Sequence, residues 1–195
     1  NDGSTDNTGV IAEEIKKKDP SVRVFHNKKP HGMGYGYKLG LQQASKEYYM
    51  YTCAYDNVPE KMVARFLEGI GKTDITLGYI DNPEYRVWIR RFFSAVFHQT
   101  MRVVSGLDLK YFNGMDLVRT ECLKKINIRS NRYTFQAECI MKLIKKNNCT
   151  YQEIPLVLKT GRKSKSKAVN LMNLIDVPKF FLFLFYDLCI FNKKK

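Results

Sequence analysis

The sequence predicts an α/β fold with a mixed, mostly parallel sheet flanked by helices, and an amphipathic helix near its carboxyl end. Helical and strand patterns alternate through residues 1–80, and such alternation is typical of a parallel sheet with crossover helices. The predicted strands are rich in β-branched and aromatic residues. The chain has 195 residues, of which 44% are hydrophobic, so it can bury the core of one domain or of one domain with an appendage.

The first elements are a polar turn over residues 1–8, a helix over 6–18 and a strand over 22–26. The helix places its apolar residues on one face, namely Val10, Ile11, Ala12 and Ile15. Crossovers between parallel strands are right-handed in nearly all proteins, so a strand is expected before the opening turn. The chain begins without a Met or a signal peptide. We therefore expect the natural chain to continue upstream of Asn1.

The remaining elements follow in order along the chain. A glycine-rich helix start is expected at 31–37. The other elements are strands at 48–53, 74–80 and 150–160, a strand and bend at 111–115, and helices at 59–70, 85–104, 119–126 and 133–146. The helix over 85–104 carries aromatic residues and arginines at helical spacing. Such a stripe is most often a core face with solvated arginines, although arginine also suits bidentate phosphate binding.

Asp56 and Asn57 follow the strand over 48–53 and precede Pro59, a residue that suits the first turn of a helix. Ligands of α/β sheets bind beyond the carboxyl ends of strands, so Asp56 would face the binding crevice. A hard divalent cation prefers oxygen ligands and keeps phosphate oxygens in its shell. Asp56 is thus a candidate ligand for a cation that carries a nucleotide diphosphate. The alternative is an ordinary turn and helix cap.

Gly32 and Gly34 lie in the glycine-rich run at the start of the second predicted helix. Glycines at a helix start allow the backbone to approach a phosphate, and the positive end of the helix dipole favours an anion. The alternative is a loop in which the glycines only permit tight contact between a helix and a strand.

The charge of +14, from 33 basic and 19 acidic residues, indicates an anionic partner such as nucleotide phosphates, anionic lipid or nucleic acid. Five scattered cysteines without a CxxC pair argue for a reducing compartment and against a zinc site or a disulfide framework. The basic run GRKSKSK over 161–167 is either a solvated charge run or a clamp on phosphate.

The stretch over 171–191 is apolar and aromatic but is interrupted by Asp176, Lys179 and Asp187. Fewer than about 18 uninterrupted apolar residues argue against a simple membrane span. Together with the lysines at 193–195, the stretch predicts a helix that lies at a membrane surface. A span that continues past the last residue and a helix docked on the domain core are the competing interpretations.

Four blocks of the sequence resemble, in the same order, the inverting family 2 glycosyltransferases of GT-A fold, and among them the dolichyl-phosphate mannose synthases and polyprenyl-phosphate glycosyltransferases. The blocks are NDGSTDNT at 1–8, HGMGYGYKLGLQQA at 31–44, TCAYDNVPE at 52–60 and FQAECIMKLIKKNNCTYQEIPLVLKTGRKSKSK at 135–167. The resemblance implies a GT-A domain over 1–168, lacking its first strand, and a membrane-associating tail over 169–195.

The resemblance also implies roles for single residues. It implies nucleotide-sugar binding by Asp2, Ser4, Gly32, Gly34, Asp56 and Asn57, binding of Mg²⁺ or Mn²⁺ by Asp56 and Asn57, phosphate binding by Arg90, Arg162, Lys165 and Lys167, and catalytic roles for Asp56, Arg90, Arg162 and Glu138. Glu138 matches the acidic position at which many relatives carry a base. The implied donor is a UDP- or GDP-linked sugar, and the implied acceptor is a polyprenyl or dolichyl phosphate at the cytosolic face of a membrane.

The sequence departs from the family pattern at Ala54, which replaces the first acidic residue of the DxD metal motif. Metal binding would then depend on Asp56, Asn57 and the phosphates of the donor. A lipid phosphate is already an anionic nucleophile and needs no strong base. Glu138→Gln should therefore cost little activity, whereas Asp56→Ala should raise the barrier by several kcal/mol.

Two other classes of function compete with a transferase. A non-catalytic GT-A domain that acts as a binding or scaffold subunit would explain Ala54. A nucleic-acid-binding domain would explain the positive charge, but the aromatic residues have core-like spacing and no recognised nucleic-acid motif is present. We therefore expect no nucleic-acid partner.

Overall fold

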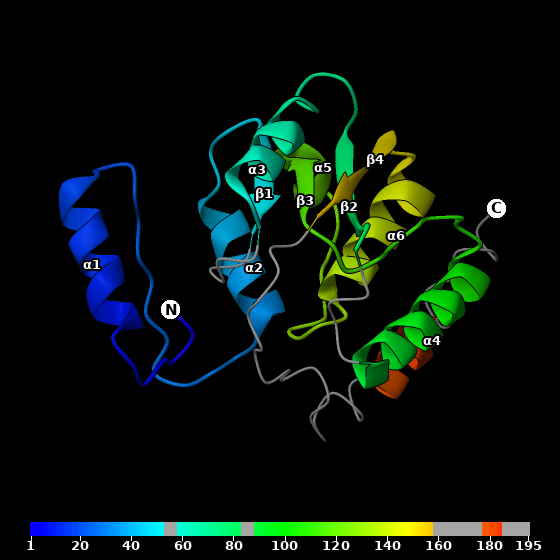
Figure 1. Cartoon of the computed structure of the whole chain (residues 1–195), viewed down its shortest axis with the longest axis horizontal. Coiled ribbons are helices and arrows are strands. Elements are labelled where there is room, and N and C mark those ends of the chain that lie inside the picture. Colours follow the sequence, from blue (N-terminus) through cyan, green and yellow to red (C-terminus); the bar gives the residue numbers. More distant parts are fainter. Residues whose placement is uncertain (53–57, 83–87, 158–176, 185–195) are drawn as a thin grey trace.

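The computed structural model describes residues 1–52, 58–82, 88–157 and 177–184 of the chain (Figure 1). Its elements, in chain order, are α1 (Thr8–Lys18), α2 (Met33–Gln43), β1 (Tyr48–Tyr51), α3 (Glu60–Leu67), β2 (Ile75–Ile80), α4 (Trp88–Ser105), β3 (Asp116–Arg119), α5 (Thr120–Lys124), α6 (Phe135–Asn147) and β4 (Tyr151–Leu156). Residues 177–184 are also helical. Outside the described residues lie Asp56, Asn57, Arg162, Lys165, Lys167 and the domain boundary expected at 168/169.

The strands form a sheet in the order β1-β3-β2-β4. β3 pairs antiparallel with both β1 and β2, and β2 pairs parallel with β4. Strands β1, β2 and β4 therefore run in one direction and β3 runs against them. The predicted mixed sheet is confirmed, although among the described strands only the pairing of β2 with β4 is parallel. The strands expected at 48–53, 74–80 and 150–160 correspond to β1, β2 and β4.

Helices cover both faces of the sheet. Successive residues of a strand point to opposite faces, so each strand supplies side chains to the packing on both sides. On β3, Leu117 joins a cluster with Met62 and Phe66 of α3, whereas the next residue, Val118, joins a larger cluster on the other face. The larger cluster contains buried residues of α2, α5 and α6, namely Tyr37, Leu41, Cys122, Leu123, Phe135, Ala137, Cys139, Ile140, Met141 and Leu143. Burial of a large apolar side chain contributes about 1.5–3 kcal/mol, so these contacts fix the helices against the sheet.

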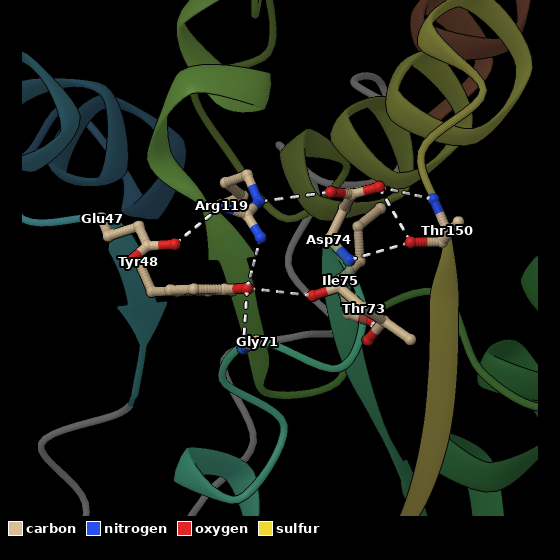
Figure 2. A network of polar contacts seen from close by, with 8 residues as sticks. All are labelled: Glu47, Tyr48, Gly71, Thr73, Asp74, Ile75, Arg119 and Thr150. Atoms are coloured by element: carbon tan, nitrogen blue, oxygen red, sulfur yellow. Dashed lines mark hydrogen bonds and ion pairs between the residues drawn. The ribbon is translucent and has the colours of Figure 1, made fainter.

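Polar side chains tie the strands together at the end of the sheet where β1, β2 and β4 begin (Figure 2). Arg119, the last residue of β3, donates to Glu47 over 2.6 Å and to Asp74 over 3.3 Å. Arg119 also donates to the hydroxyl of Tyr48 over 3.1 Å. Asp74 Oδ2 accepts from the backbone N–H and the hydroxyl of Thr150 over 2.9 and 2.8 Å. The strand-end network thus links residues at or beside the ends of all four strands of the sheet.

The region around α1 differs from the sequence-based expectation. No residue of α1 is buried, and Val10 and Ile11 are 60% and 53% exposed. Figure 1 shows α1 standing apart from the sheet. Residues 22–26 are not the expected strand, because a strand needs a continuous hydrogen-bonding neighbour. In the described part of the chain, an isolated bridge between Asp2 and Asn27 lies just after this segment and does not extend into it.

The strand and bend expected at 111–115 are confirmed only in part, since the bend lies within these residues but the strand, β3, begins at Asp116. Gly114 in the bend lies directly against Gly78 of β2, where a Cβ atom on Gly114 would overlap the carbonyl group of Gly78. The N–H of Gly78 donates to Met115 O over 2.9 Å. The bend therefore packs directly against β2, and the pairing of β3 with β2 begins after it.

α4 presents only part of its aromatic stripe to the core. Its exposed large apolar residues are Trp88, Ile89, Phe92, Phe93, Val96 and Val103. The inner side is narrower and consists of Phe97, Met101 and Val104, which contact the larger cluster. Much of the apolar surface of α4 is therefore left outside the core.

Residues 177–184 pack beside α4 (Figure 1). Phe180 and Leu184 are buried in the larger cluster, and the rings of Phe180 and Phe181 lie 6.3 and 5.7 Å from that of Phe97. This piece of the tail is docked on the core, which was one of the three interpretations of the sequence. In the described ranges no helix combines the length and the apolarity needed to cross a membrane.

Candidate functional site

The carboxyl ends of β1, β2 and β4 lie at one edge of the sheet, because these strands run in the same direction. They end at Tyr51, Ile80 and Leu156. The sequence continues from this carboxyl edge into residues predicted to bind metal and phosphate, namely Asp56 and Asn57 after β1 and Arg162, Lys165 and Lys167 after β4. Ligands bind beyond such strand ends in α/β proteins. The roles of these five residues remain predictions, since they lie outside the described ranges.

The starts of α2 and α6 lie at the carboxyl end of β1. Tyr51, the last residue of β1, donates its hydroxyl to the sulfur of Met33 over 3.3 Å. The ring of Tyr51 also lies 5.5 Å from that of Phe135, the first residue of α6. The N-termini of both helices therefore meet the edge of the sheet from which the chain runs toward Asp56.

Asp2 holds the backbone that leads into α2. Its Oδ1 accepts from Asn27 Nδ2 over 2.8 Å, and its Oδ2 accepts from the N–H of Gly32 over 2.7 Å. Both oxygens accept from the N–H of His31, over 2.9 and 3.0 Å. Partial burial acts to raise the pKa of the Asp2 carboxyl, but the hydrogen bonds from His31, Asn27 and Gly32 outweigh it and lower that pKa from its ordinary value. Asp2 is therefore an ionised anchor for the start of α2.

Gly32 and Gly34 lie against the backbone of Ser130 and Asn131. Gly32 has φ of 102°, which residues with a Cβ atom rarely adopt. A Cβ atom on Gly32 would overlap the carbonyl oxygen of Asn131, and one on Gly34 would overlap that of Ser130. The Asn131 oxygen accepts from the N–H groups of Gly34 and Tyr35 over 2.8 and 3.2 Å. The glycines thus permit tight packing, and their contact with a nucleotide remains a prediction.

Glu138 is buried in α6 with both carboxylate oxygens occupied. Oε1 accepts from the N–H of Arg129 over 3.0 Å and Oε2 from that of Ser130 over 2.9 Å. Lys142 donates to Oε1 and also to the carbonyl oxygen of Asn127, the latter over 2.7 Å. Burial acts to raise the pKa of Glu138, but hydrogen bonds from Arg129, Lys142 and Ser130 outweigh it and lower that pKa. Sequence reasoning missed Lys142, although four residues is the spacing at which opposite charges meet on a helix.

One chain of contacts joins Asp2 to Glu138 through the start of α2 and the loop over 127–131. Asp2 holds the backbone before α2, the Asn131 carbonyl of the loop binds the first amides of α2, and Glu138 holds the amides of the loop. Lys38 of α2 adds a contact to the same loop by donating to Asn131 Oδ1 over 2.5 Å. Three of the four blocks singled out in the sequence therefore meet in one place.

Asp116 was not singled out from the sequence, although it is buried at the same edge, opposite Tyr51 in the register of β1 and β3. Its Oδ1 has no hydrogen-bond partner among the described residues. Burial raises the pKa of Asp116 to about 7, and hydrogen bonds from Gln136 and the Tyr51 backbone offset only part of this effect. A signal was available, because an aspartate between Met115 and Leu117 interrupts an apolar run.

Ser4 and Arg90, the other described candidates, lie on separate elements. Ser4 is exposed in the turn before α1, where its N–H donates to Asn1 Oδ1 over 3.1 Å. Arg90 is half-buried in the first turn of α4. In the part of the chain that the structure describes, no three His, Cys, Asp or Glu side chains are grouped to hold a metal ion. The oxygen donors of Asp56 and Asn57 are of the type that Mg²⁺ and Mn²⁺ prefer.

Comparison with known sequences identifies the family. The sequence profile of glycosyl transferase family 2 matches residues 1–123. The chain belongs to glycosyl transferase family 2. The matched region contains the blocks at 1–8, 31–44 and 52–60, so the resemblance drawn from those residues is confirmed at the level of the family.

Relatives of the chain share part of its length. Glycosyltransferase GlyG of Streptococcus pneumoniae serotype 4 is 32% identical over 73 residues, which are 37% of this chain and 24% of GlyG. Glucosyl-3-phosphoglycerate synthase from Mycobacterium tuberculosis, in complex with Mg²⁺ and UDP, matches with a TM-score of 0.60 and 14% identity over 88% of this chain and 62% of the synthase. The same synthase in complex with Mn²⁺ and UDP-glucose matches with a TM-score of 0.58 and 15% identity, over 91% of this chain and 62% of the synthase. These structural matches show the GT-A-like fold, and the chain spans about a quarter of GlyG.

Proposed function

We propose that this family 2 domain belongs to an inverting glycosyltransferase of the dolichyl-phosphate mannose synthase and polyprenyl-phosphate glycosyltransferase type. It moves a sugar from a UDP- or GDP-linked donor to a lipid phosphate. The observation that carries the proposal is the chain of contacts from Asp2 to Glu138, which gathers three family blocks beside the carboxyl end of β1. Asp56 follows β1 from that edge, and ligands of α/β sheets bind there.

The donor is inferred from the residues that follow β1. The M. tuberculosis synthase, which shares the fold, was crystallised with UDP and with Mg²⁺ or Mn²⁺. The oxygens of Asp56 and Asn57 fit such a cation, which when bound stabilises the negative charge that develops on a leaving nucleoside diphosphate. Because Ala54 replaces the first acidic residue of the motif, Asp56 supplies its remaining carboxylate.

The acceptor is inferred from Glu138. A general base needs a lone pair within hydrogen-bond reach of the proton that it removes. Glu138 is 4% exposed, and its oxygens already hold two backbone amides and Lys142. A hydroxyl acceptor would need a base, whereas a phosphate is ionised at neutral pH and attacks without one. With Glu138 engaged, a phosphate acceptor fits this chain better than a hydroxyl that would depend on Glu138 to lose its proton, and the family resemblance is what makes that phosphate a lipid phosphate.

In the proposed reaction the residues of the chain bind the donor, orient the acceptor and neutralise the charge of their phosphates. Asp2 and Ser4 contact the base or ribose, and four cations hold the donor diphosphate or the acceptor phosphate, namely Arg90, Arg162, Lys165 and Lys167. The acceptor oxygen attacks the anomeric carbon from the face opposite the nucleoside diphosphate. The new carbon–oxygen bond forms as the bond to the diphosphate breaks, so the configuration at that carbon inverts.

A lipid acceptor would place the protein at the cytosolic face of a membrane, as a peripheral protein. The net charge of +14 suits anionic headgroups. In this proposal residues 1–168 carry out sugar transfer and residues 169–195 associate with the membrane.

Ala54 favours a second candidate function, a non-catalytic binding or scaffold subunit. With one carboxylate in the motif, the affinity for a cation would be lower than with two. Such a subunit would keep the fold and the contacts of Asp2 and Glu138 without turning over a donor.

The test is sugar transfer by the full-length natural protein from UDP-glucose or GDP-mannose to dolichyl phosphate, with Mn²⁺ or with a chelator. We expect metal-dependent transfer from one donor to dolichyl phosphate, and no transfer to dolichol, which offers only a hydroxyl. Transfer to dolichol with an equal rate would contradict the acceptor assignment. The absence of any product from a folded protein that binds nucleotide would favour the scaffold subunit.

A further inference from the structure

α4 presents an apolar row to solvent. Trp88, Phe92 and Val96 are spaced by four residues and therefore lie along one side of the helix. They are 73%, 59% and 49% exposed. Ile89 and Phe93 flank the row and are exposed as well. An apolar patch on this scale normally marks a contact surface, since monomeric proteins expose few contiguous large apolar side chains.

The same region is basic. α4 contains three arginines and no acidic residue over its 18 residues. Arg91 is exposed between Trp88 and Phe92 in the sequence. The helical segment 177–184, which packs on α4, has exposed Lys179, Leu182 and Phe183 and also lacks acidic residues. An apolar face bordered by cations is typical of a helix that lies in the interface of an anionic bilayer.

We infer that α4 docks on an anionic lipid surface through an outer face made of Trp88, Ile89, Arg91, Phe92, Phe93 and Val96. The aromatic and aliphatic side chains enter the boundary between headgroups and acyl chains, and Arg91 pairs with lipid phosphate. A second copy of the chain is a poorer occupant, because a two-fold contact would bring the arginines of both copies together. This surface lies outside the transfer chemistry, although it would serve the lipid acceptor of the proposed function.

α1 offers a matched comparison within the same chain. It also exposes apolar side chains, with Val10 at 60% and Ile11 at 53%. Its sequence, however, includes Glu13 and Glu14 beside its lysines. If exposed apolar surface alone caused membrane binding, α1 would contribute as much as α4. If binding also needs a helix that carries arginines and no acidic residue of its own, as α4 does, α1 would contribute less.

The test is co-sedimentation of the full chain with vesicles of phosphatidylcholine, with or without phosphatidylserine. We expect binding to the anionic vesicles that weakens at high salt, because exposed charges are screened. The double variant Trp88→Ser/Phe92→Ser should lower the vesicle partition coefficient by roughly tenfold or more, since the two side chains lose their apolar contact with the bilayer. The control variant Val10→Ser/Ile11→Ser should bind like the parent.

Several outcomes would overturn the inference. They are equal binding by the α4 variant and the parent, an equal loss in the α1 control, or no binding of the parent to either vesicle. A concentration-dependent dimer that disappears in the α4 variant would assign the face to a second copy instead. Vesicle binding needs no sugar donor, so loss of nucleotide binding with intact vesicle binding would remove the proposed function and leave this inference standing.

Discussion

Asp74 and Asp116 lie at opposite ends of the pairing between β2 and β3, in environments that shift their pKa values in opposite directions. Asp74, just before β2, accepts hydrogen bonds from Thr150 and pairs with Arg119, and these contacts lower its pKa from the ordinary value (Figure 2). Asp116, the first residue of β3, is buried, and burial raises its pKa to about 7. The strand-end network satisfies Asp74, whereas Asp116 keeps an oxygen without a partner among the described residues.

This difference separates two uses of polar groups. The strand-end network serves the fold, because its members bond to one another at or beside the ends of the four strands. At the carboxyl edge, a buried acid is left poorly satisfied, and the chain continues from β1 to Asp56 and from β4 to Arg162. Unsatisfied buried groups and perturbed pKa values are common at functional sites. Substitutions in the strand-end network should therefore change stability alone, whereas at the carboxyl edge the loss of Asp56 should change activity.

The largest expected effect is that of Asp56→Ala. It should reduce transfer by about a hundredfold or more, because the last carboxylate of the metal motif is lost and the charge on the leaving diphosphate is less stabilised. The midpoint of thermal unfolding should stay unchanged. Metal-dependent transfer and calorimetric unfolding, measured on the same preparation, check both parts. Activity equal to that of the parent would remove Asp56 from the site.

Glu138→Gln tests a buried carboxylate beside the site. Both of its oxygens already accept hydrogen bonds within the fold. The free energy of unfolding should fall by about 3–5 kcal/mol, since Lys142 would be left buried without its partner. Adding Lys142→Met should restore much of the loss. The rate of transfer per folded molecule should stay within about threefold of the parent, because a phosphate acceptor needs no base. A folded double variant that cannot turn over would make Glu138 a base and the acceptor a hydroxyl.

Asp74→Ala tests the strand-end network. Removing the acceptor of the Thr150 and Arg119 hydrogen bonds should lower the free energy of unfolding by about 1–3 kcal/mol. The pKa of Asp74 is lowered in the folded state, so its stabilisation is present above the ordinary value of 3.8 and is lost as pH falls through the folded-state pKa. Urea unfolding at pH 7 and pH 3 should thus show a smaller difference from the parent at pH 3. The rate of sugar transfer per folded molecule should be unaffected. A loss of transfer without a loss of folded protein would contradict the assignment of the strand-end network to stability alone.

Asp116→Asn should change the free energy of unfolding by no more than Asp74→Ala does, and in the opposite direction, because the variant should be more stable than the parent. Folded Asp116 binds its proton more tightly than the unfolded residue, so stability falls as pH rises from 3.8 to about 7 and is level above that range. The amide cannot ionise, so the variant should flatten this slope and gain roughly 1–3 kcal/mol over the parent at pH 8. Urea unfolding from pH 4 to pH 8 measures the slope. A variant with the same slope as the parent would show that another group titrates.

The local pattern of the sequence was sufficient to predict the helices and strands that pair with or pack against the rest of the domain. β1, β2, β4, α2, α3 and α6 appear where periodicity and turn residues placed them. The strand expected at 22–26 failed because strand formation depends on a hydrogen-bonding neighbour, which local pattern does not report. The aromatic stripe of α4 was predicted correctly only in part for a related reason, since periodicity shows that a helix has an apolar side but not what covers it.

The candidate site was predictable where a residue type carried its own chemistry and not where a contact depended on the tertiary structure. Asp2, Gly32 and Glu138 were identified from motifs, and the structure brings them into one chain of contacts. Asn131 was not identified, because its contribution is a backbone carbonyl oxygen, which any residue possesses. The position of Asp116 in an apolar run was a sequence signal for burial, but its raised pKa depends on the tertiary structure that buries it.

The most direct test of the carboxyl edge as a nucleotide site is calorimetric binding of UDP and GDP, with and without Mn²⁺. The parent, Asp56→Ala and Asp74→Ala should be compared as folded proteins. The account predicts metal-dependent binding of one nucleotide by the parent and by Asp74→Ala, with loss of that binding in Asp56→Ala. Binding that survives Asp56→Ala, or no binding of either nucleotide by the folded parent, would contradict it.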